Sequence, residues 1–162
     1  MKLITHELLD ELTLRARASA RGRAHHEIHA SAADLVQRFV VAVERRSYIR
    51  PHRHRTRAEL AWVVRGSFEV ITFDDEGRIQ SRHGIGKDSP CVAFETPPAV
   101  WHTLLAHRDG SAFLEIKQGP YDPATASEFA AWAPAEGTPE APAFQQRLLA
   151  ALAQSGNPIT HR

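Results

Sequence analysis

Two histidines separated by a single residue, His52 and His54, are followed five positions later by Glu59. A third histidine, His102, ends a downstream run that begins with Pro97 and Pro98. Imidazole nitrogens and a carboxylate oxygen form a complete ligand set for a divalent transition metal. The sequence therefore predicts a metal site with His52, His54, Glu59 and His102 as ligands. Iron, zinc, manganese and nickel all remain candidates, because these ligand types serve each of them.

The spacing of these residues dictates what the backbone must do. On a strand, His52 and His54 project from the same face, with Cβ atoms about 7 Å apart. Glu59 stands at an odd offset from His54, so one continuous strand would turn it to the opposite face. We expect residues 55–58 to form a turn and Glu59 to open the adjacent antiparallel strand. His102 must then arrive from a later strand, which the preceding prolines hold extended.

The elements around these residues are short strands with turns at regular intervals, a pattern typical of an all-β sandwich or barrel. Turn residues occur at Arg65–Ser67, at Asp74–Gly77 and at Arg108–Gly110, and a loop is expected at Gly84–Pro90. The predicted strands are Val36–Val43, Glu59–Val64, Phe68–Phe73, Arg78–Arg82, Val92–Glu95, Trp101–Ala106 and Ala112–Lys117.

The two ends of the chain have a different character. Residues 3–18 show helical periodicity, whereas Arg17–Ala30 lacks periodicity and is expected to be an irregular connection containing His25, His26 and His29. Beyond Gly119, two helical pieces are expected at Ala126–Trp132 and Ala143–Ala153. The second should dock on the barrel through Leu148, Leu149 and Leu152, and residues 154–162 should be frayed.

Composition excludes several classes of protein. A chain of 162 residues with 43% hydrophobic and 24% charged residues corresponds to one globular domain. A formal net charge of +1 gives no indication of nucleic-acid binding. No apolar run approaches the roughly 20 residues that span a bilayer, and the N-terminus turns acidic too early for a signal peptide, so a cytoplasmic location is expected. The single cysteine, Cys91, excludes an intrachain disulfide and a four-cysteine zinc site.

The histidine and glutamate pattern resembles the cupin superfamily. Its first motif is matched by His52, His54, Glu59 and Gly66, with Arg46 at the position of the motif's first glycine. The second motif is matched by Pro97 and His102. Cys91 and Ala99 stand at its glycine positions and Ala106 at its asparagine position. The resemblance implies an all-β fold: a single cupin barrel, also called a double-stranded β-helix or jelly roll.

Three further segments are similar to the WbuC-type cupin-fold metalloproteins, namely Met1–Thr5, Tyr48–His54 and Glu115–Gly137. This resemblance implies a metal-binding protein that acts on a sugar, for example a nucleotide-linked one, in surface-polysaccharide or O-antigen metabolism. The expected organisation is an N-terminal helix and connection over residues 1–30, a cupin barrel over 31–120, and a C-terminal helical tail over 121–162 packing on the barrel.

Strand parity extends the prediction to neighbouring residues. If Glu59 faces the interior, Trp62 and its apolar neighbours Leu60 and Val64 face outward. An apolar stripe of this kind is normally covered, either by the terminal helices or by a second subunit, and a homodimer is the expected arrangement. The same parity from His102 places His107 on the surface. His83 is expected to be solvated.

Three residues are candidates for catalysis. Glu115 and Lys117 share one face of the last strand, and Glu115 would serve as a general base if that face is inward. The apolar pair Leu114 and Ile116 favours the other face as the inward one, which would leave Glu115 and Lys117 as a surface ion pair. Tyr121, after a Gly-Pro turn, would cap the pocket. His29 lies either over the barrel mouth or in a plain loop.

Three functions fit this sequence. The first is an enzyme, acting as an isomerase or epimerase on a nucleotide-linked sugar, or as an Fe(II)-type dioxygenase on a small organic substrate. The second is a non-catalytic module that binds a small molecule, such as a carbohydrate, through the metal. The third is a purely structural ion, which is disfavoured because structural zinc sites prefer cysteine ligands.

Overall fold

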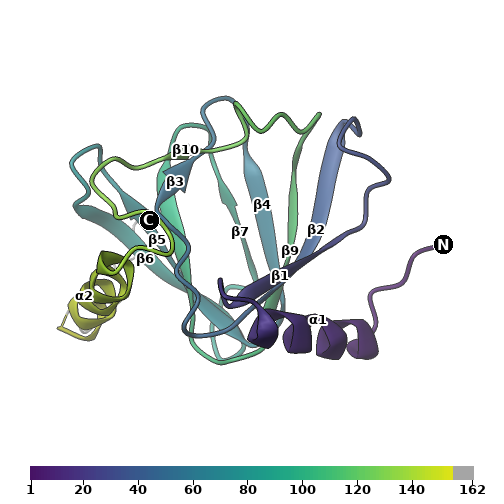
Figure 1. Cartoon of the computed structure of the whole chain (residues 1–162), viewed down its shortest axis with the longest axis horizontal. Coiled ribbons are helices and arrows are strands. Elements are labelled where there is room, and N and C mark those ends of the chain that lie inside the picture. The colour runs from purple at the N-terminus through teal and green to yellow at the C-terminus, as the bar shows by residue number, and fades with distance from the viewer. Residues whose placement is uncertain (155–162) are drawn as a thin grey trace.

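Two five-stranded antiparallel sheets face each other in the computed structural model, which describes residues 1–154 (Figure 1). Sheet A has the order β1 (Arg23–Glu27), β2 (Val36–Val43), β9 (Ser111–Gln118), β4 (Glu59–Arg65), β7 (Ala93–Thr96). Sheet B has the order β10 (Glu128–Phe129), β3 (His52–Arg53), β8 (Trp101–Ala106), β5 (Ser67–Phe73), β6 (Ile79–Gly86). The predicted all-β barrel is confirmed.

The main core lies between the sheets, where alternate residues of each strand meet. Ala61 and Val63 of β4 pack there with Phe68 of β5 and Leu104 of β8. On the opposite face of β4, Trp62 is 53% exposed. The predicted alternation along β4 and β8 is therefore confirmed. The residues of β4 that share a face with Glu59 point to the interior, and Trp62 faces outward.

Helix α1 (His6–Ala18) covers part of the outer face of sheet A. Thr5 caps it by accepting a hydrogen bond from the backbone N–H of Leu8, which explains why the helix begins three residues after the predicted start. Its buried residues Leu9 and Leu12 pack against Val40 of β2. Because an apolar helix face is buried there, the outward residues of β2 and β9 are apolar as well.

Helix α2 (Glu140–Gln154) packs on the outer face of sheet B, where Leu148 joins Ile71, Phe73 and Trp101 in a second apolar cluster (Figure 1). The predicted helix at Ala143–Ala153 and the docking of Leu148 and Leu149 are confirmed. Gln154, the first residue of the predicted frayed end, is instead the last residue of α2. The rest of that end and the side chain of Leu152 lie outside the described residues. No described helix has both the length and the apolar character needed to cross a membrane.

Three local predictions were wrong. Residues 23–27, expected to be irregular, form β1, which pairs with β2 along its whole length. Residues 126–132, expected to be helical, instead contain the two-residue strand β10, which pairs with β3. The loop expected from Gly84 begins later, because β6 continues to Gly86 against β5. In each case pairing with another strand decided a segment whose own sequence pattern is weak.

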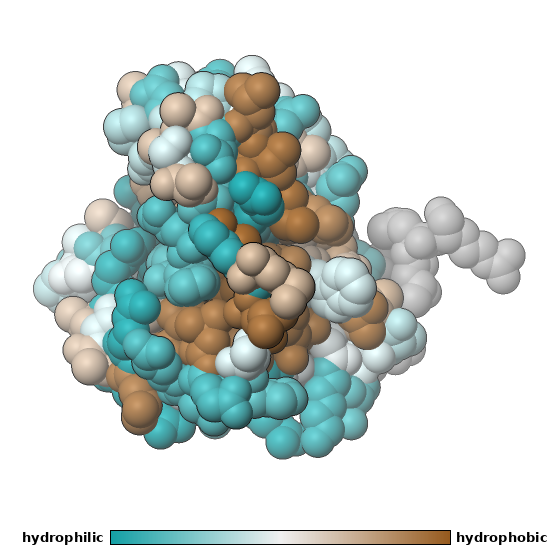
Figure 2. All heavy atoms as spheres, turned by 90° about the vertical axis from the view of Figure 1, so that its right-hand side faces the viewer, coloured by the Kyte–Doolittle hydropathy of each residue, from teal (hydrophilic) through white to brown (hydrophobic). Residues whose placement is uncertain are grey.

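An apolar surface remains on the outside of the molecule. Trp62 and Val64 of β4 are exposed and lie outside the apolar clusters that contain the two helices. Figure 2, which views the right-hand side of Figure 1, shows apolar side chains gathered in a band between hydrophilic ones. The outward apolar residues of β4 were expected to be covered either by the terminal helices or by a second subunit. The terminal helices pack elsewhere.

Candidate metal centre and its pocket

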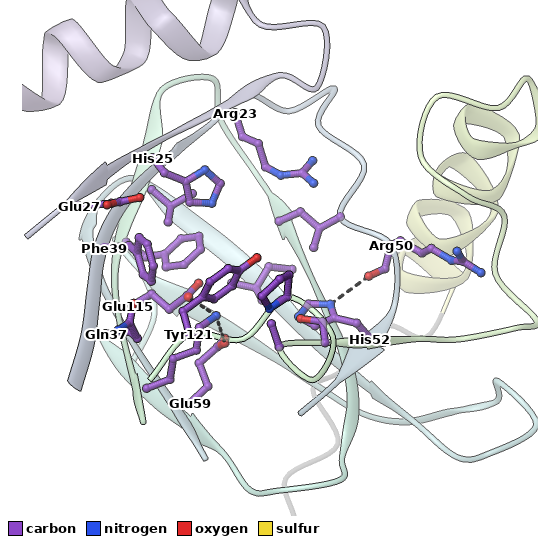
Figure 3. Close-up of a pocket in the computed structure, with 18 of the residues that line it drawn as sticks. Arg23, His25, Glu27, Gln37, Phe39, Arg50, His52, Glu59, Glu115 and Tyr121 are labelled. Carbon is purple, nitrogen blue, oxygen red and sulfur yellow. Dashed lines mark hydrogen bonds and ion pairs between the residues drawn. The ribbon is translucent and has the colours of Figure 1, made fainter. Parts of the chain in front are cut away.

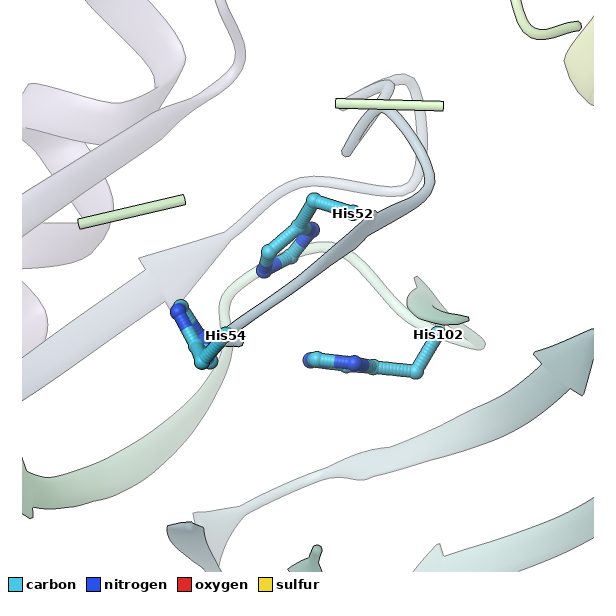
Figure 4. A group of neighbouring side chains, drawn as sticks. All are labelled: His52, His54 and His102. Atoms are coloured by element: carbon cyan, nitrogen blue, oxygen red, sulfur yellow. The ribbon is translucent and has the colours of Figure 1, made fainter. Parts of the chain in front are cut away.

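His52, His54 and His102 converge inside the barrel, as Figure 4 shows. His52 lies on β3 and His102 on β8, where the two are direct partners in the antiparallel ladder. One ring nitrogen from each histidine lies within 4.8 Å of the others. The predicted convergence of the three histidines is therefore observed, and His54 and His102 are almost fully buried.

The backbone fixes which nitrogen each imidazole presents. In every ring Nδ1 is beside a carbonyl oxygen, which can only accept a hydrogen bond. The distances are 3.0 Å from His52 to Arg50, 2.6 Å from His54 to Ala126, and 3.0 Å from His102 to Val100. Each Nδ1 must therefore carry the proton, and each Nε2 presents a lone pair. Metal-binding histidines are typically oriented in this way.

The Nε2 atoms confirm that this donor set suits a cation. Nε2 of His102 is buried and has no hydrogen-bond partner among the described residues. Nε2 of His54 faces Oε2 of Glu59 at 2.7 Å. A bare imidazole nitrogen and a carboxylate repel each other at that distance, so a proton or a metal ion must lie between or beside them.

Glu59 reaches the histidines from the other sheet. It begins β4 in sheet A, whereas β3 and β8 belong to sheet B. The turn at residues 55–58 therefore carries the chain across the barrel, and the expectation that β4 pairs with the strand of His52 was wrong. Its Oε1 lies 3.8 Å from Nε2 of His102. The carboxylate thus stands beside both buried histidines, as its predicted role as a ligand requires.

The pKa values show how strongly these groups are coupled. Removal of the His52 ring from water, reinforced by the neighbouring His102, lowers the pKa of His52 to about 3. Burial by itself raises the pKa of Glu59, but His102, His54 and the Lys117 ammonium outweigh it and hold that pKa well below its usual range. The neutral ring of His52 and the ionised carboxylate of Glu59 are therefore both in the protonation states that bind metals.

Lys117 and Glu115 also face the interior. Nζ of Lys117 lies 2.6 Å from Oε1 of Glu115 and 3.5 Å from Oε2 of Glu59. The inference that Leu114 and Ile116 form the inward face was wrong, because Leu114 packs toward α1 and its cluster on the outside. Burial, followed by the charge of Glu59, raises the pKa of Glu115. Burial lowers the pKa of Lys117, but the two carboxylates outweigh it and raise that pKa.

A cavity of about 580 Å³ opens in front of these residues (Figure 3). His52 and Glu59 lie on its wall, together with Glu115, Lys117 and Tyr121. The three candidate catalytic residues thus share one cavity with the metal centre. Tyr121 is half exposed, which places it at the edge of the cavity.

Other residues of the cavity wall were not predicted from the sequence. They come from β1, β2 and β10 and include His25, Gln37, Phe39 and Phe129. Enclosure by the cavity, followed by the positive charges of Arg23 and Arg21, lowers the pKa of His25 to about 4. The imidazole is exposed to the cavity and neutral, so it can either donate or accept a hydrogen bond. In the sequence, the only indication that this segment contributes to the site was the group of histidines at positions 25, 26 and 29.

Three further histidines that the sequence analysis considered, His29, His83 and His107, lie in two different settings. His29 is buried, lines the cavity and accepts a hydrogen bond through Nδ1 from the backbone N–H of Arg38 at 3.1 Å, so it lies over the barrel mouth rather than in a plain loop. His107 lies on the surface, 3.4 Å from Glu69, as predicted. His83 is partly exposed on β6, outside the cavity.

Solved structures with a similar fold place the barrel in a known class. Oxalate oxidase in complex with the substrate analogue glycolate has a TM-score of 0.52 and 14% identity, over 85% of this chain and 72% of that one. Protein SO0799 from Shewanella oneidensis has a TM-score of 0.54 and 13% identity, over 68% of this chain and 75% of that one. The protein has the cupin fold, and at these identities the likeness shows the fold alone.

A family model described as "Domain of unknown function (DUF6016)" matches residues 4–85, half of the chain. The chain belongs to this family. The matched segment runs from α1 to β6 and includes His52, His54 and Glu59. No curated protein sequence matched the chain.

Proposed function

We propose that this protein is a metal-dependent cupin in which His52, His54 and His102, together with Glu59, hold a divalent transition metal at the wall of a cavity that binds a small polar molecule. The observation that carries the proposal is the common orientation of the three imidazoles. Each Nδ1–H is engaged by a backbone carbonyl, so each Nε2 is left for a ligand. The orphaned Nε2 of His102 is explained by such an ion.

A metal in this position supplies Lewis acidity toward an oxygen atom of the bound molecule. Around it, Glu115 is the group suited to hold or accept a proton, because its raised pKa brings it closer to neutral pH. Lys117 balances the charges of Glu115 and Glu59, both within its reach. Tyr121 would cap the bound molecule at the edge of the cavity. We therefore favour an enzyme over a purely structural site.

The finer proposal concerns the substrate. The cavity combines aromatic side chains, such as Phe39 and Phe129, with carboxylates and imidazoles, and this mixture suits the apolar faces and hydroxyl groups of a sugar. Its volume of about 580 Å³ is in the range of small-molecule sites. The similarity of residues 115–137 to the WbuC-type proteins supports a nucleotide-linked sugar in surface-polysaccharide metabolism. A dioxygenase on a small organic substrate, or a non-catalytic binding module, uses the same cavity.

The assembly and location are proposed on separate grounds. Trp62 and Val64 form an exposed apolar surface on β4, which supports a homodimer. Cys91, a free and exposed thiol, suits a reducing compartment such as the cytoplasm.

Elemental analysis of the protein purified without added metal tests the central proposal. The wild type and His107→Ala, which removes a surface histidine, should carry near-stoichiometric metal, whereas His52→Ala should carry little. Iron would favour oxygen chemistry, and zinc would favour Lewis-acid chemistry. A metal content that His52→Ala leaves unchanged would overturn the assignment.

A further inference from the structure

One of the three histidines is oriented by a distant part of the chain. His52 and His102 each donate from Nδ1 to the carbonyl two residues earlier in the chain, just before their own strand begins. His54 instead donates to the carbonyl of Ala126, 72 positions away, at 2.6 Å. The orientation of His54 therefore depends on whether the segment that carries Ala126 is docked. We name this segment, residues 119–129, the strap.

The strap has few contacts in its middle. Residues 120–125 are exposed. At its start, the backbone N–H groups of Gly119 and Tyr121 donate to the carbonyls of Leu35 and Ala32, at 2.8 Å and 2.7 Å. These bonds lie at the end of the strap that is remote from Ala126, so the position of the Ala126 carbonyl must be set from the other end.

At that other end, Glu128 binds the two arginines that flank His54. Its carboxylate lies 2.7 Å from Nε of Arg53 and 2.7 Å from Nε of Arg55. Glu128 also faces Arg53 across the short β10–β3 ladder. The guanidinium of Arg53 is fixed in turn, because it stacks 4.2 Å from the ring of Trp101. Glu128 thus ties the strap to residues on both sides of His54, two positions after the carbonyl that holds its ring.

The same strap forms part of the cavity wall. Tyr121, Pro123, Ala126, Ser127 and Phe129 line the cavity, and Tyr121 and Phe129 are each about half exposed. Movement of the strap would therefore open the cavity and release Nδ1 of His54 in one step. The pocket and the histidine cluster share this element.

We propose that Glu128 is a positioning residue for the metal centre: its ion pairs with Arg53 and Arg55 dock the strap, and the docked Ala126 carbonyl holds His54 with Nε2 toward the ion. This inference rests on the proposed metal site. By linkage, a molecule that packs on the strap inside the cavity should tighten metal binding, and the metal should tighten its binding equally.

The test is the affinity for Co²⁺, measured with a competing chelator and through its visible absorption, in the wild type, Glu128→Gln and Asp10→Asn. Asp10 is a matched control, since it is an exposed carboxylate paired at 2.6 Å with Arg65 near α1. Loss of a direct outer partner of a metal ligand typically weakens binding about 10- to 100-fold; Glu128 acts through that partner, the Ala126 carbonyl, so its effect should lie at the low end of this range. We expect about tenfold weaker binding and an altered Co²⁺ spectrum in Glu128→Gln, and no change in Asp10→Asn.

Three results separate the possibilities. No Co²⁺ binding by the wild type overturns the metal site itself, and the positioning role with it. Equal affinity of the wild type and Glu128→Gln overturns the positioning role alone. An equal loss in Asp10→Asn also overturns it, since the effect would then be general. Arg55→Gln is a second variant for the case that Glu128→Gln does not fold, because it leaves the ion pair of Arg53 and Glu128 intact. It should weaken Co²⁺ binding in the same direction but by less, and it should speed hydrogen exchange in the strap.

Discussion

His52 and His102 are direct partners across β3 and β8, and their ring centroids lie 4.5 Å apart. The approach of the two imidazoles is therefore set by the register of the sheet. A shift of one residue in either strand would turn one ring to the opposite face. The pairing of His52 with His102 is thus built into the barrel, whereas the ring of His54 is oriented by the strap through the carbonyl of Ala126.

Substitution of His102 provides the most direct test of metal-linked stability. A ligand that binds only the folded state stabilises it, by about 2.7 kcal/mol at a free concentration of 100 times its Kd. We expect chelation to lower the Tm of the metal-loaded wild type and to leave that of His102→Gln unchanged. Differential scanning calorimetry with and without chelator measures this. An equal response of both proteins would contradict the assignment of His102.

Ala99 occupies a strained position in the turn before β8. Its φ is +65°, a left-handed conformation that costs a non-glycine residue roughly 1–2 kcal/mol, while its N–H donates to the carbonyl of His54 at 2.8 Å. Glycine removes the strain but has a larger entropy loss on folding. We expect Ala99→Gly to raise the free energy of unfolding by about 0.5–1 kcal/mol in urea titrations. Ala16→Gly, inside α1, should lower it, and a loss in both would refute the explanation.

Glu136 supports the buried guanidinium of Arg23 beside the cavity. Removing one partner of a buried ion pair costs several kcal/mol. Because Glu136 keeps some exposure and Arg23 retains bonds to Ser47 and Tyr48, we expect Glu136→Gln to lower the free energy of unfolding by about 2 kcal/mol at pH 7. Urea unfolding of both proteins measures this difference.

The same pair predicts a pH dependence. Burial raises the pKa of Glu136, but Arg21 and Arg23 outweigh it and lower that pKa below its usual 4.5. A folded-state pKa below the unfolded one stabilises the protein above pH 4.5 and loses that contribution as the pH falls through the folded value. The wild type should therefore approach Glu136→Gln in stability below pH 4.5. A gap that is constant with pH would show that charge is not its cause.

Trp62 tests the proposed homodimer. A carboxylate in an apolar interface is costly to bury, so Trp62→Glu should convert the dimer into the 18.0 kDa monomer, as measured by light scattering. Leu14→Glu alters an exposed apolar residue of α1 and should leave the mass unchanged. An 18.0 kDa mass for the wild type at high concentration would contradict the dimer.

The sequence sufficed to bring the three histidines and Glu59 together, because strand parity and the spacing of polar residues are local properties. Glu59 was assigned to the interior as a member of the histidine and glutamate pattern, and Trp62 to the exterior from alternation along β4. The glycine of the first motif, Gly66, has a φ of +71°, and a Cβ there would lie 2.3 Å from Oγ of Ser111. That position therefore requires glycine.

Non-local features defeated the same reasoning. Leu114 appeared to be a core residue because α1 gives the outer face of β9 an apolar cover, so both faces of β9 contain apolar side chains. His25 was missed because β1 exists only through its pairing with β2. Likewise, β10 depends on Glu128 meeting Arg53, a contact between residues 75 positions apart.

The division of the metal centre between two sheets has a mechanical consequence. The carboxylate of Glu59 stands on sheet A, His52 and His102 stand on sheet B, and His54 directly follows β3, so an ion bound to all four would link the two layers of the barrel. Parting of the layers would break ligand bonds rather than apolar contacts alone. Occupancy of the centre would therefore set the stiffness of the walls that enclose the cavity, and with it the rate at which molecules enter and leave.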